Sequence, residues 1–144
     1  MNLLQLNSII VPVDFSEECA EAVNVALELA EKPTKVTLLH VKYPASYINA
    51  GTAYVHIDEE RHKQEVETGL QQFILRHGWQ NIESIVLSGD PGNEIATYAE
   101  KNNASLIIIP THGYHGFKRL MLGSVADRVI NLASCPVLIL KRKD

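Results

Sequence analysis

The sequence predicts an α/β fold, a doubly wound five-stranded parallel sheet with helices on both faces. Five short apolar runs, rich in β-branched residues, lie at 9–13, 36–41, 85–87, 106–109 and 137–140. The runs are continuous rather than alternating, which is typical of strands covered on both faces. Amphipathic helical patterns separate them, and this β-α-β alternation predicts right-handed crossovers. One strand order for such a chain is 3-2-1-4-5.

The first helix is expected after the run at 9–13. Ser16 is a suitable N-cap, and the two glutamates that follow favour the positive end of a helix. Apolar residues then repeat at intervals of three and four, which is the spacing of one helix face. These residues are Cys19, Ala22, Ala26, Leu29 and Ala30.

Three further helices are expected between the later runs. One should end at Gly78, one should begin at Pro91 and Gly92, and one should follow Gly123. Ser124 and Asp127 have the spacing of a capping box, so Ser124 is the predicted N-cap of the last helix. The apolar stripes of the three helices are Val66, Leu70, Phe73, Ile74 and His77; Ile95, Ala96 and Ala99; and Val125, Val129, Leu132 and Ala133.

Size and composition limit the class of protein. The 144 residues fit one domain, 1–144, and the 46% hydrophobic and 21% charged content is ordinary for a globular protein. A net charge of −4 gives no basic field, so we expect no general nucleic-acid binding. No apolar run is long enough to span a membrane, and no signal peptide is recognisable. Cys19 and Cys135 lie among apolar residues, as core thiols do in a reducing cytoplasm.

A candidate phosphate site follows the fourth predicted strand. Gly113 lies just after this strand, and nine residues later Gly123 and Ser124 open the last helix. Amides at a helix N-terminus, beside glycines that permit close approach, bind anions. In the order 3-2-1-4-5 the winding reverses between strands one and four, so a ligand should lie between Asp14 and the loop at Thr111.

Each of these residues also has a purely structural interpretation. The two glycines suit ordinary turns, Asp14 suits a loop that caps a helix, and Val41 is a normal strand residue. His112 and His115 are too few for a metal site, and we predict none. No nucleophile has a neighbouring general base in the sequence, so no catalytic residue is predicted.

Several segments together resemble the universal stress protein family, nearly from end to end. The resemblance lies in Ile9-Ile-Val-Pro-Val-Asp-Phe-Ser16, Leu38-Leu-His-Val41, Gly89-Asp-Pro-Gly-Asn-Glu-Ile95, Thr111-His-Gly113, Gly123-Ser124 and Cys135-Pro-Val-Leu-Ile139. The nucleotide-binding branch of that family has Gly, two residues, Gly, nine residues, Gly, then Ser or Thr. Its members hold ATP in the cleft of a 3-2-1-4-5 sheet.

The resemblance implies an ATP site, with Mg²⁺ as a possible companion ion. Pro12, Asp14 and Val41 would surround the adenine. Thr111, His112 and Gly113 would border the ribose and phosphate, and Gly123, Ser124 and Val125 would hold the phosphates. The chain departs from the family at the first motif glycine, which is Pro110 here. Proline removes one N–H donor, although its carbonyl can still accept from a ribose hydroxyl.

The resemblance also implies a homodimer that pairs through the last strand, formed by Val137, Leu138, Ile139 and Leu140. An open edge strand favours such pairing, whereas the basic residues that follow it could keep a monomer in solution. Three functions stay open at this point. The first is a nucleotide-binding stress or regulatory protein, the second is a dimeric interaction module without nucleotide, and the third is a slow ATP hydrolase.

Overall fold

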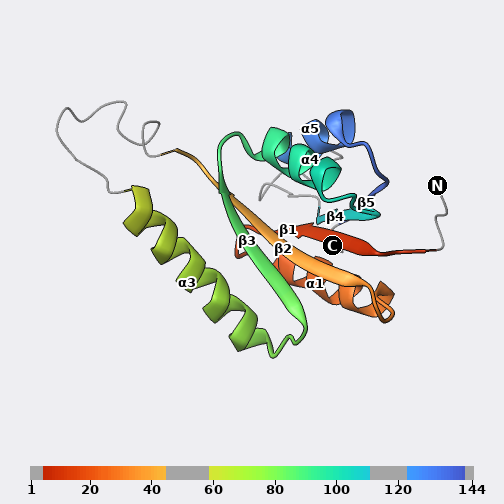
Figure 1. The fold of residues 1–144 in the computed structure, drawn as a ribbon, viewed down its shortest axis with the longest axis horizontal. Helices are drawn as coiled ribbons and strands as arrows, with labels where there is room; N and C mark the ends of the chain where they lie inside the picture. Colours follow the sequence, from red (N-terminus) through yellow and green to blue (C-terminus); the bar gives the residue numbers. More distant parts are fainter. Residues whose placement is uncertain (1–4, 45–58, 111–122, 142–144) are drawn as a thin grey trace.

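The computed structural model describes residues 5–44, 59–110 and 123–141, in which strands and helices alternate (Figure 1). The chain runs through β1 (Ser8–Pro12), α1 (Glu17–Leu29), β2 (Lys35–Lys42), α3 (Glu59–His77), β3 (Ile82–Ser88), α4 (Pro91–Lys101), β4 (Leu106–Pro110), α5 (Ser124–Leu132) and β5 (Val137–Leu140). All five predicted strands and all four predicted helices are therefore present.

The strands form one parallel sheet in the order β3-β2-β1-β4-β5, which confirms the predicted topology. The pairing between β1 and β2 runs from Ser8↔Lys35 to Pro12↔Leu39. Because every strand points the same way, the carboxyl ends of all five strands lie along one edge of the sheet.

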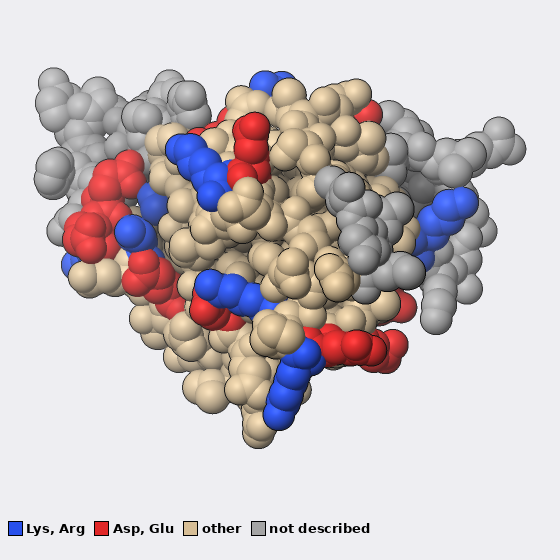
Figure 2. All heavy atoms as spheres, turned by 45° about the vertical axis from the view of Figure 1, so that its right-hand side comes forward, with Lys and Arg blue, Asp and Glu red and all other residues tan. Residues whose placement is uncertain are grey.

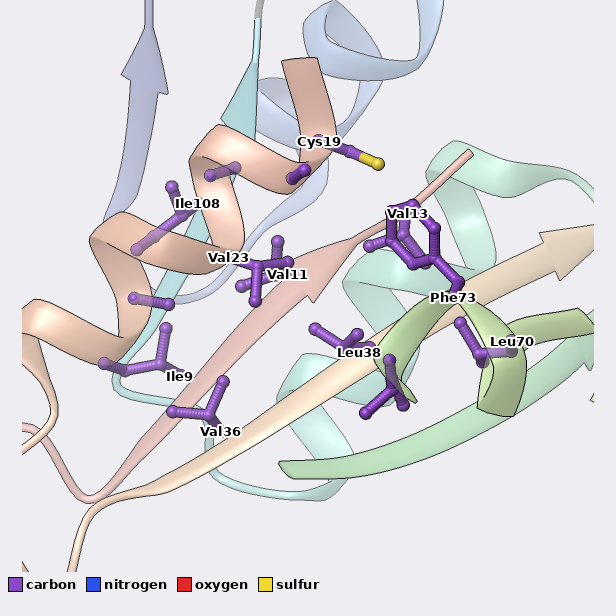
Figure 3. Close-up of a cluster of buried hydrophobic side chains, with 14 of the residues drawn as sticks. Ile9, Val11, Val13, Cys19, Val23, Val36, Leu38, Leu70, Phe73 and Ile108 are labelled. Atoms are coloured by element: carbon purple, nitrogen blue, oxygen red, sulfur yellow. The ribbon is translucent and has the colours of Figure 1, made fainter. Parts of the chain in front are cut away.

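Helices cover both faces of the sheet (Figure 1). On one face, α1 and α3 pack over the odd-numbered residues of β1, including Ile9 and Val11, as Figure 3 shows. On the other face, α4 and α5 pack over Ile10 and its neighbours. Successive strand residues point to opposite faces, so a strand buried on both sides must be apolar throughout. This explains the continuous apolar runs of the sequence.

The ends of three helices follow the local sequence as expected. The Ser16 hydroxyl accepts from the backbone N–H of Cys19 and caps α1. Gly78 ends α3 with a φ of 67°, a backbone conformation that favours glycine. Pro91 is the first residue of α4, and the Asp90 carboxylate before it accepts from the N–H of Asn93 at 3.1 Å. The predicted start of α4 is thus confirmed, and Asp90 is a cap that the apolar pattern did not indicate.

The prediction that Ser124 caps the last helix is wrong. Gly123 occupies the N-cap position, and Ser124 is already the first helical residue of α5. No described side chain makes a capping hydrogen bond there, because the residue at the N-cap is a glycine. The capping-box spacing of Ser124 and Asp127 was therefore coincidental.

Two elements are longer than their apolar patterns. The strand predicted at 85–87 extends over Ile82–Ser88, since Glu83 and Ser84 interrupt the apolar run on an edge strand that water can reach. Helix α3 begins at Glu59, seven residues before its first stripe residue, Val66.

Cys19 is buried in the core and Cys135 is half-buried, and both are free thiols.

Acidic and basic side chains are interspersed on the molecular face in Figure 2, with uncharged surface between them. Some charged side chains form ion pairs between different strands or helices. One example is Lys35 of β2, whose Nζ lies 2.8 Å from Oε2 of Glu83 in β3. Within the described segments, none of the helices has the length and apolar character needed to cross a bilayer.

Candidate functional site at the carboxyl edge of the sheet

The two central strands separate at their carboxyl ends. Within the described strands, β1 and β4 pair only at Ile9↔Leu106 and Ile10↔Ile107. By contrast, β1 stays paired with β2 as far as Pro12, and β4 stays paired with β5 as far as Pro110. The winding of the sheet reverses between β1 and β4, so the separation lies at the switch point where doubly wound folds bind ligands.

A pair of prolines explains this separation. The N–H of Val13 donates to the Leu39 carbonyl at 2.9 Å, so the backbone groups of Val13 point toward β2. The backbone groups of successive residues point to opposite sides of a strand, and those of Pro12 must therefore point toward β4. The N–H of Ile107 donates to the Pro136 carbonyl at 3.0 Å, on the β5 side, so Pro110, three residues later, faces β1.

Neither proline has the N–H that would continue the ladder between β1 and β4. The pairing has to stop at this point, although both strands continue. What remains on the two facing backbones is a pair of carbonyl groups, from Pro12 and Pro110, which can accept hydrogen bonds but not donate them. Pro110 therefore acts together with Pro12, a relation that the sequence alone did not reveal.

His40 holds the end of β1 against β2. Its Nδ1 lies 2.7 Å from the Val13 carbonyl oxygen, and its ring lies 4.8 Å from the ring of Phe15. Phe15 has a φ of 67°, which is uncommon for a residue with a side chain. The ring of Phe15 also meets Phe73 edge-on at 5.6 Å. The turn after β1 is thus held by contacts to β2 and α3.

Asp14 and Val41 both lie at this edge. Pro12, the last residue of β1, pairs with Leu39, so Asp14 lies two residues beyond the end of β1 and Val41 lies two residues further along β2. Asp14 is exposed, and its Oδ1 accepts from the N–H of Ser16 at 3.0 Å. The carboxylate therefore shapes the turn after β1. The cap of α1 is Ser16 and not Asp14, so the structural interpretation of Asp14 as a helix cap is wrong.

The first turn of α5 lies at the same edge, because α5 leads back to the amino end of the parallel strand β5. Ser124 is exposed, and Val125 is half-buried against the same apolar cluster as Val41. The missing side-chain cap leaves the first-turn amides of α5 without a described side-chain acceptor. Such a helix end is suited to an anion.

A cavity of about 570 Å³ lies beside this helix end. Its walls come from the end of β2, the start of α4 and one side of α5. The lining residues used below are Tyr43, Asp90, Gly92, Ser124, Val125 and Arg128.

The predicted site residues fall into two groups. Pro12, Asp14, Val41 and Pro110 lie at the carboxyl ends of three adjacent strands, and Gly123, Ser124 and Val125 open α5. Thr111, His112 and Gly113, like His115, lie outside the described residues. Among the residues that are described, no three His, Cys, Asp or Glu side chains gather as metal ligands.

Sequence reasoning missed three side chains at this edge, His40, Asp90 and Arg128. The partner of His40, Val13, lies 27 residues away along the chain. Arg128 contacts Asn93, which lies 35 residues away. A local pattern gives no signal for such contacts. Only Asp90 had a signal, since an Asp before a Pro at a helix start is a recognisable cap.

Comparisons with known proteins agree with this architecture. The model of the universal stress protein family matches residues 6–141. Universal stress protein YxiE of Bacillus subtilis is 34% identical over 94% of this chain and 99% of its own length. The solved structure of protein MJ0577, a universal stress protein of Methanocaldococcus jannaschii, has a TM-score of 0.74 at 26% identity, covering 96% of this chain and 98% of that one.

More distant structures share the fold. A universal stress protein in complex with cAMP has a TM-score of 0.63 at 20% identity, covering 94% of this chain and 96% of that one. A family member from Arabidopsis thaliana with AMP bound has a TM-score of 0.57 at 21% identity, covering 95% and 92%. The strand order, the separated central strands and the matched family model together lead to one conclusion: this chain belongs to the universal stress protein family.

Proposed function

We propose that this protein binds an adenine nucleotide, ATP, at the carboxyl edge of the sheet and acts as a stress-response or regulatory module. One observation carries the proposal: the ladder between β1 and β4 ends at two prolines beside a helix N-terminus without a described side-chain cap. Such an edge offers acceptors at one end and donors at the other, which matches the two ends of a nucleotide.

The acceptor end suits the base and the ribose. An adenine amino group donates hydrogen bonds, and the backbone at Pro12, Asp14 and Val41 would receive them. The Pro110 carbonyl would accept from a ribose hydroxyl, with Thr111, His112 and Gly113 bordering the ribose and phosphate.

The donor end suits the phosphates. The amides of Gly123, Ser124 and Val125 gather where the helix dipole favours negative charge. Mg²⁺ would accompany the phosphates and neutralise part of their charge. Two distant family members have cAMP and AMP bound, and this supports an adenine nucleotide as the ligand proposed here.

The proposal is tested by calorimetric titration of the protein with ATP and Mg²⁺, after adenine nucleotide carried over from expression has been assayed and removed. The sharpest variant is Val125→Pro, because a proline in the first helical turn removes one amide donor and preserves the helix. We expect Val125→Pro to weaken ATP binding about tenfold, since one charge-assisted hydrogen bond is lost.

Val125→Ala is the matched control, since it shortens the side chain and keeps the amide. The ATP affinity of this control should stay close to that of the unchanged protein. Absence of binding at millimolar ATP would defeat the proposal. Release of inorganic phosphate from ATP in the same samples would add slow ATP hydrolysis to the function.

A second candidate function is a dimeric interaction module without nucleotide, and Pro110 is the observation that favours it. The variant Pro110→Gly restores the donor found in the nucleotide-binding branch. If ATP bound tightly to Pro110→Gly and not to the unchanged protein, the interaction module would replace the first proposal.

We also propose a homodimer through β5, the last strand of the sheet order. Apolar side chains flank this strand on both faces of the sheet. Leu138 is 36% exposed, and on α5 Ile130 is 41% and Leu132 is 50% exposed. Pairing of β5 with its copy about a two-fold axis would cover them.

We further place the protein in the cytoplasm as a single domain, and its two free thiols support a reducing compartment.

A further inference from the structure

Helices α4 and α5 meet closely at Gly92 and Arg128. Gly92 is buried, and a Cβ built there would lie 2.7 Å from the Cβ and Cγ of Arg128 and 2.8 Å from its Cδ. Real Cβ atoms essentially never lie this close to another heavy atom, so any side chain at position 92 would push α5 away from α4. The absence of a side chain at Gly92 is thus a requirement of the helix packing.

The head of Arg128 ties α5 to the start of α4. Its Nε lies 3.1 Å from Oδ2 of Asp90 and 3.3 Å from Oδ1 of Asn93. The same Asp90 oxygen accepts from the N–H of Asn93 and caps α4. One carboxylate therefore caps one helix and holds the arginine of the other.

The contact lies one helical turn from the proposed phosphate site. Arg128 follows Ser124 by four residues, so the two lie on the same side of α5. Both line the cavity beside the helix end, together with Asp90 and Gly92. A shift of α5 relative to α4 would thus move the amides of Ser124 and Val125.

We infer that Arg128 is a positioning residue for phosphate binding: held by Asp90 and seated on Gly92, it fixes where the first turn of α5 presents its amides. This inference rests on the proposed function. The ion pair is half-exposed and is by itself worth little to stability, so its main effect is on geometry. The described partners of the guanidinium lie at the start of α4, which favours positioning over direct contact with a phosphate.

The test compares the binding of ATP with that of adenosine, which lacks the phosphates. Arg128→Met keeps an unbranched apolar stem and removes the guanidinium, whereas Gly92→Ala keeps the guanidinium and separates the helices. We expect each variant to weaken ATP binding about fivefold to tenfold and to leave adenosine binding unchanged. A loss of overall stability would lower both affinities together. Should Gly92→Ala not fold, Arg128→Met decides the matter alone.

Asp90→Asn distinguishes positioning from direct contact. Asparagine caps a helix as well as aspartate does, but it removes the charge that holds Arg128. A positioning role predicts weaker ATP binding in Asp90→Asn, by less than in Arg128→Met. Tighter ATP binding would mean that the released guanidinium reaches the phosphate directly, and it would overturn the inference.

The remaining outcomes separate the two proposals. If the unchanged protein binds ATP and neither Arg128→Met nor Gly92→Ala alters the preference for ATP over adenosine, only the positioning role is overturned. If the unchanged protein binds neither compound, the proposed function fails, and the positioning role falls with it.

Discussion

At the scale of single residues, His40 joins the two strands that frame the adenine end of the proposed site. Its contact with the Val13 carbonyl and its ring contact with Phe15 stabilise a turn that contains an uncommon backbone conformation. His77 makes a similar pair of contacts in another place. Its Nδ1 lies 2.8 Å from the Phe73 carbonyl, and its ring stacks on Trp79.

The two histidines therefore form a matched pair of variants. His40→Ala and His77→Ala should each lower the free energy of unfolding by about 1–2 kcal/mol, through one lost hydrogen bond and lost ring packing. Only His40→Ala should also weaken adenosine and ATP binding, because only His40 holds the end of β1. Urea unfolding and calorimetric titration measure the two effects. Equal nucleotide binding by both variants would contradict this role for His40.

Cys19 makes the free energy of unfolding depend on pH, and the burial of its thiol sets the sign of this dependence. Cys19 is 1% exposed, and its thiol donates to the Ser16 carbonyl at 2.9 Å. Burial is the largest cause that raises the pKa of the Cys19 thiol above its ordinary value. When the pH rises past the ordinary value, the unfolded chain loses this proton first, while the folded protein keeps it. The free energy of unfolding therefore falls with rising pH until the pH passes the raised value.

This slope can be measured against Cys19→Ala, in which the titrating group is absent. Urea unfolding from about pH 7 to about pH 10 should show that the unchanged protein loses stability relative to the variant. Because Cys135 is present in both proteins, its own raised pKa cancels in the comparison. A constant difference between the two proteins across that range would show that the burial of Cys19 has no such effect.

At the scale of elements, β5 carries the proposed association. Among the described strands β5 is the last in the sheet order, and Leu138 lies on one face of the sheet while Ile130 and Leu132 of α5 lie toward the other. A charge on an edge strand opposes pairing with a second edge. Leu138→Lys should therefore convert a dimer of the unchanged protein into a monomer.

Leu75→Lys is the control for this experiment. Leu75 lies on α3 and is 77% exposed, so the same substitution there adds the same charge far along the chain from β5. Sedimentation velocity should give the mass of a dimer for Leu75→Lys and of a monomer for Leu138→Lys. A monomeric unchanged protein, or a dimeric Leu138→Lys, would rule out association through β5.

The elements also differ in how well their patterns mark their ends. Strands and helices buried on a defined face were found from the apolar residues, and Ser16, Gly78 and Pro91 marked three helix ends. The start of α3 was not marked, because Glu59, Glu60 and their neighbours face water and have no apolar period. A local pattern records burial, so an exposed turn of helix leaves no trace in it.

At the scale of the whole molecule, the fold and its family agree with each other. The five strands in one parallel sheet and the two core clusters on opposite faces accompany a regular alternation of strand and helix, and the family match extends over residues 6–141. The candidate site lies where that regularity breaks, between the two halves of the sheet. Sequence reasoning located this edge because it depends on topology.

The amino-acid sequence by itself determined the α/β class, the order of elements, the apolar core and the residues that follow each strand at the carboxyl edge. These features follow from local periodicity and turn chemistry, which neighbouring residues encode. Only the tertiary structure decided that the backbone groups of Pro12 and Pro110 point toward the gap between β1 and β4, that His40 holds Val13, and that Arg128 lies on Gly92. Such contacts depend on how strands and helices from distant parts of the chain pack, and no local pattern contains that information.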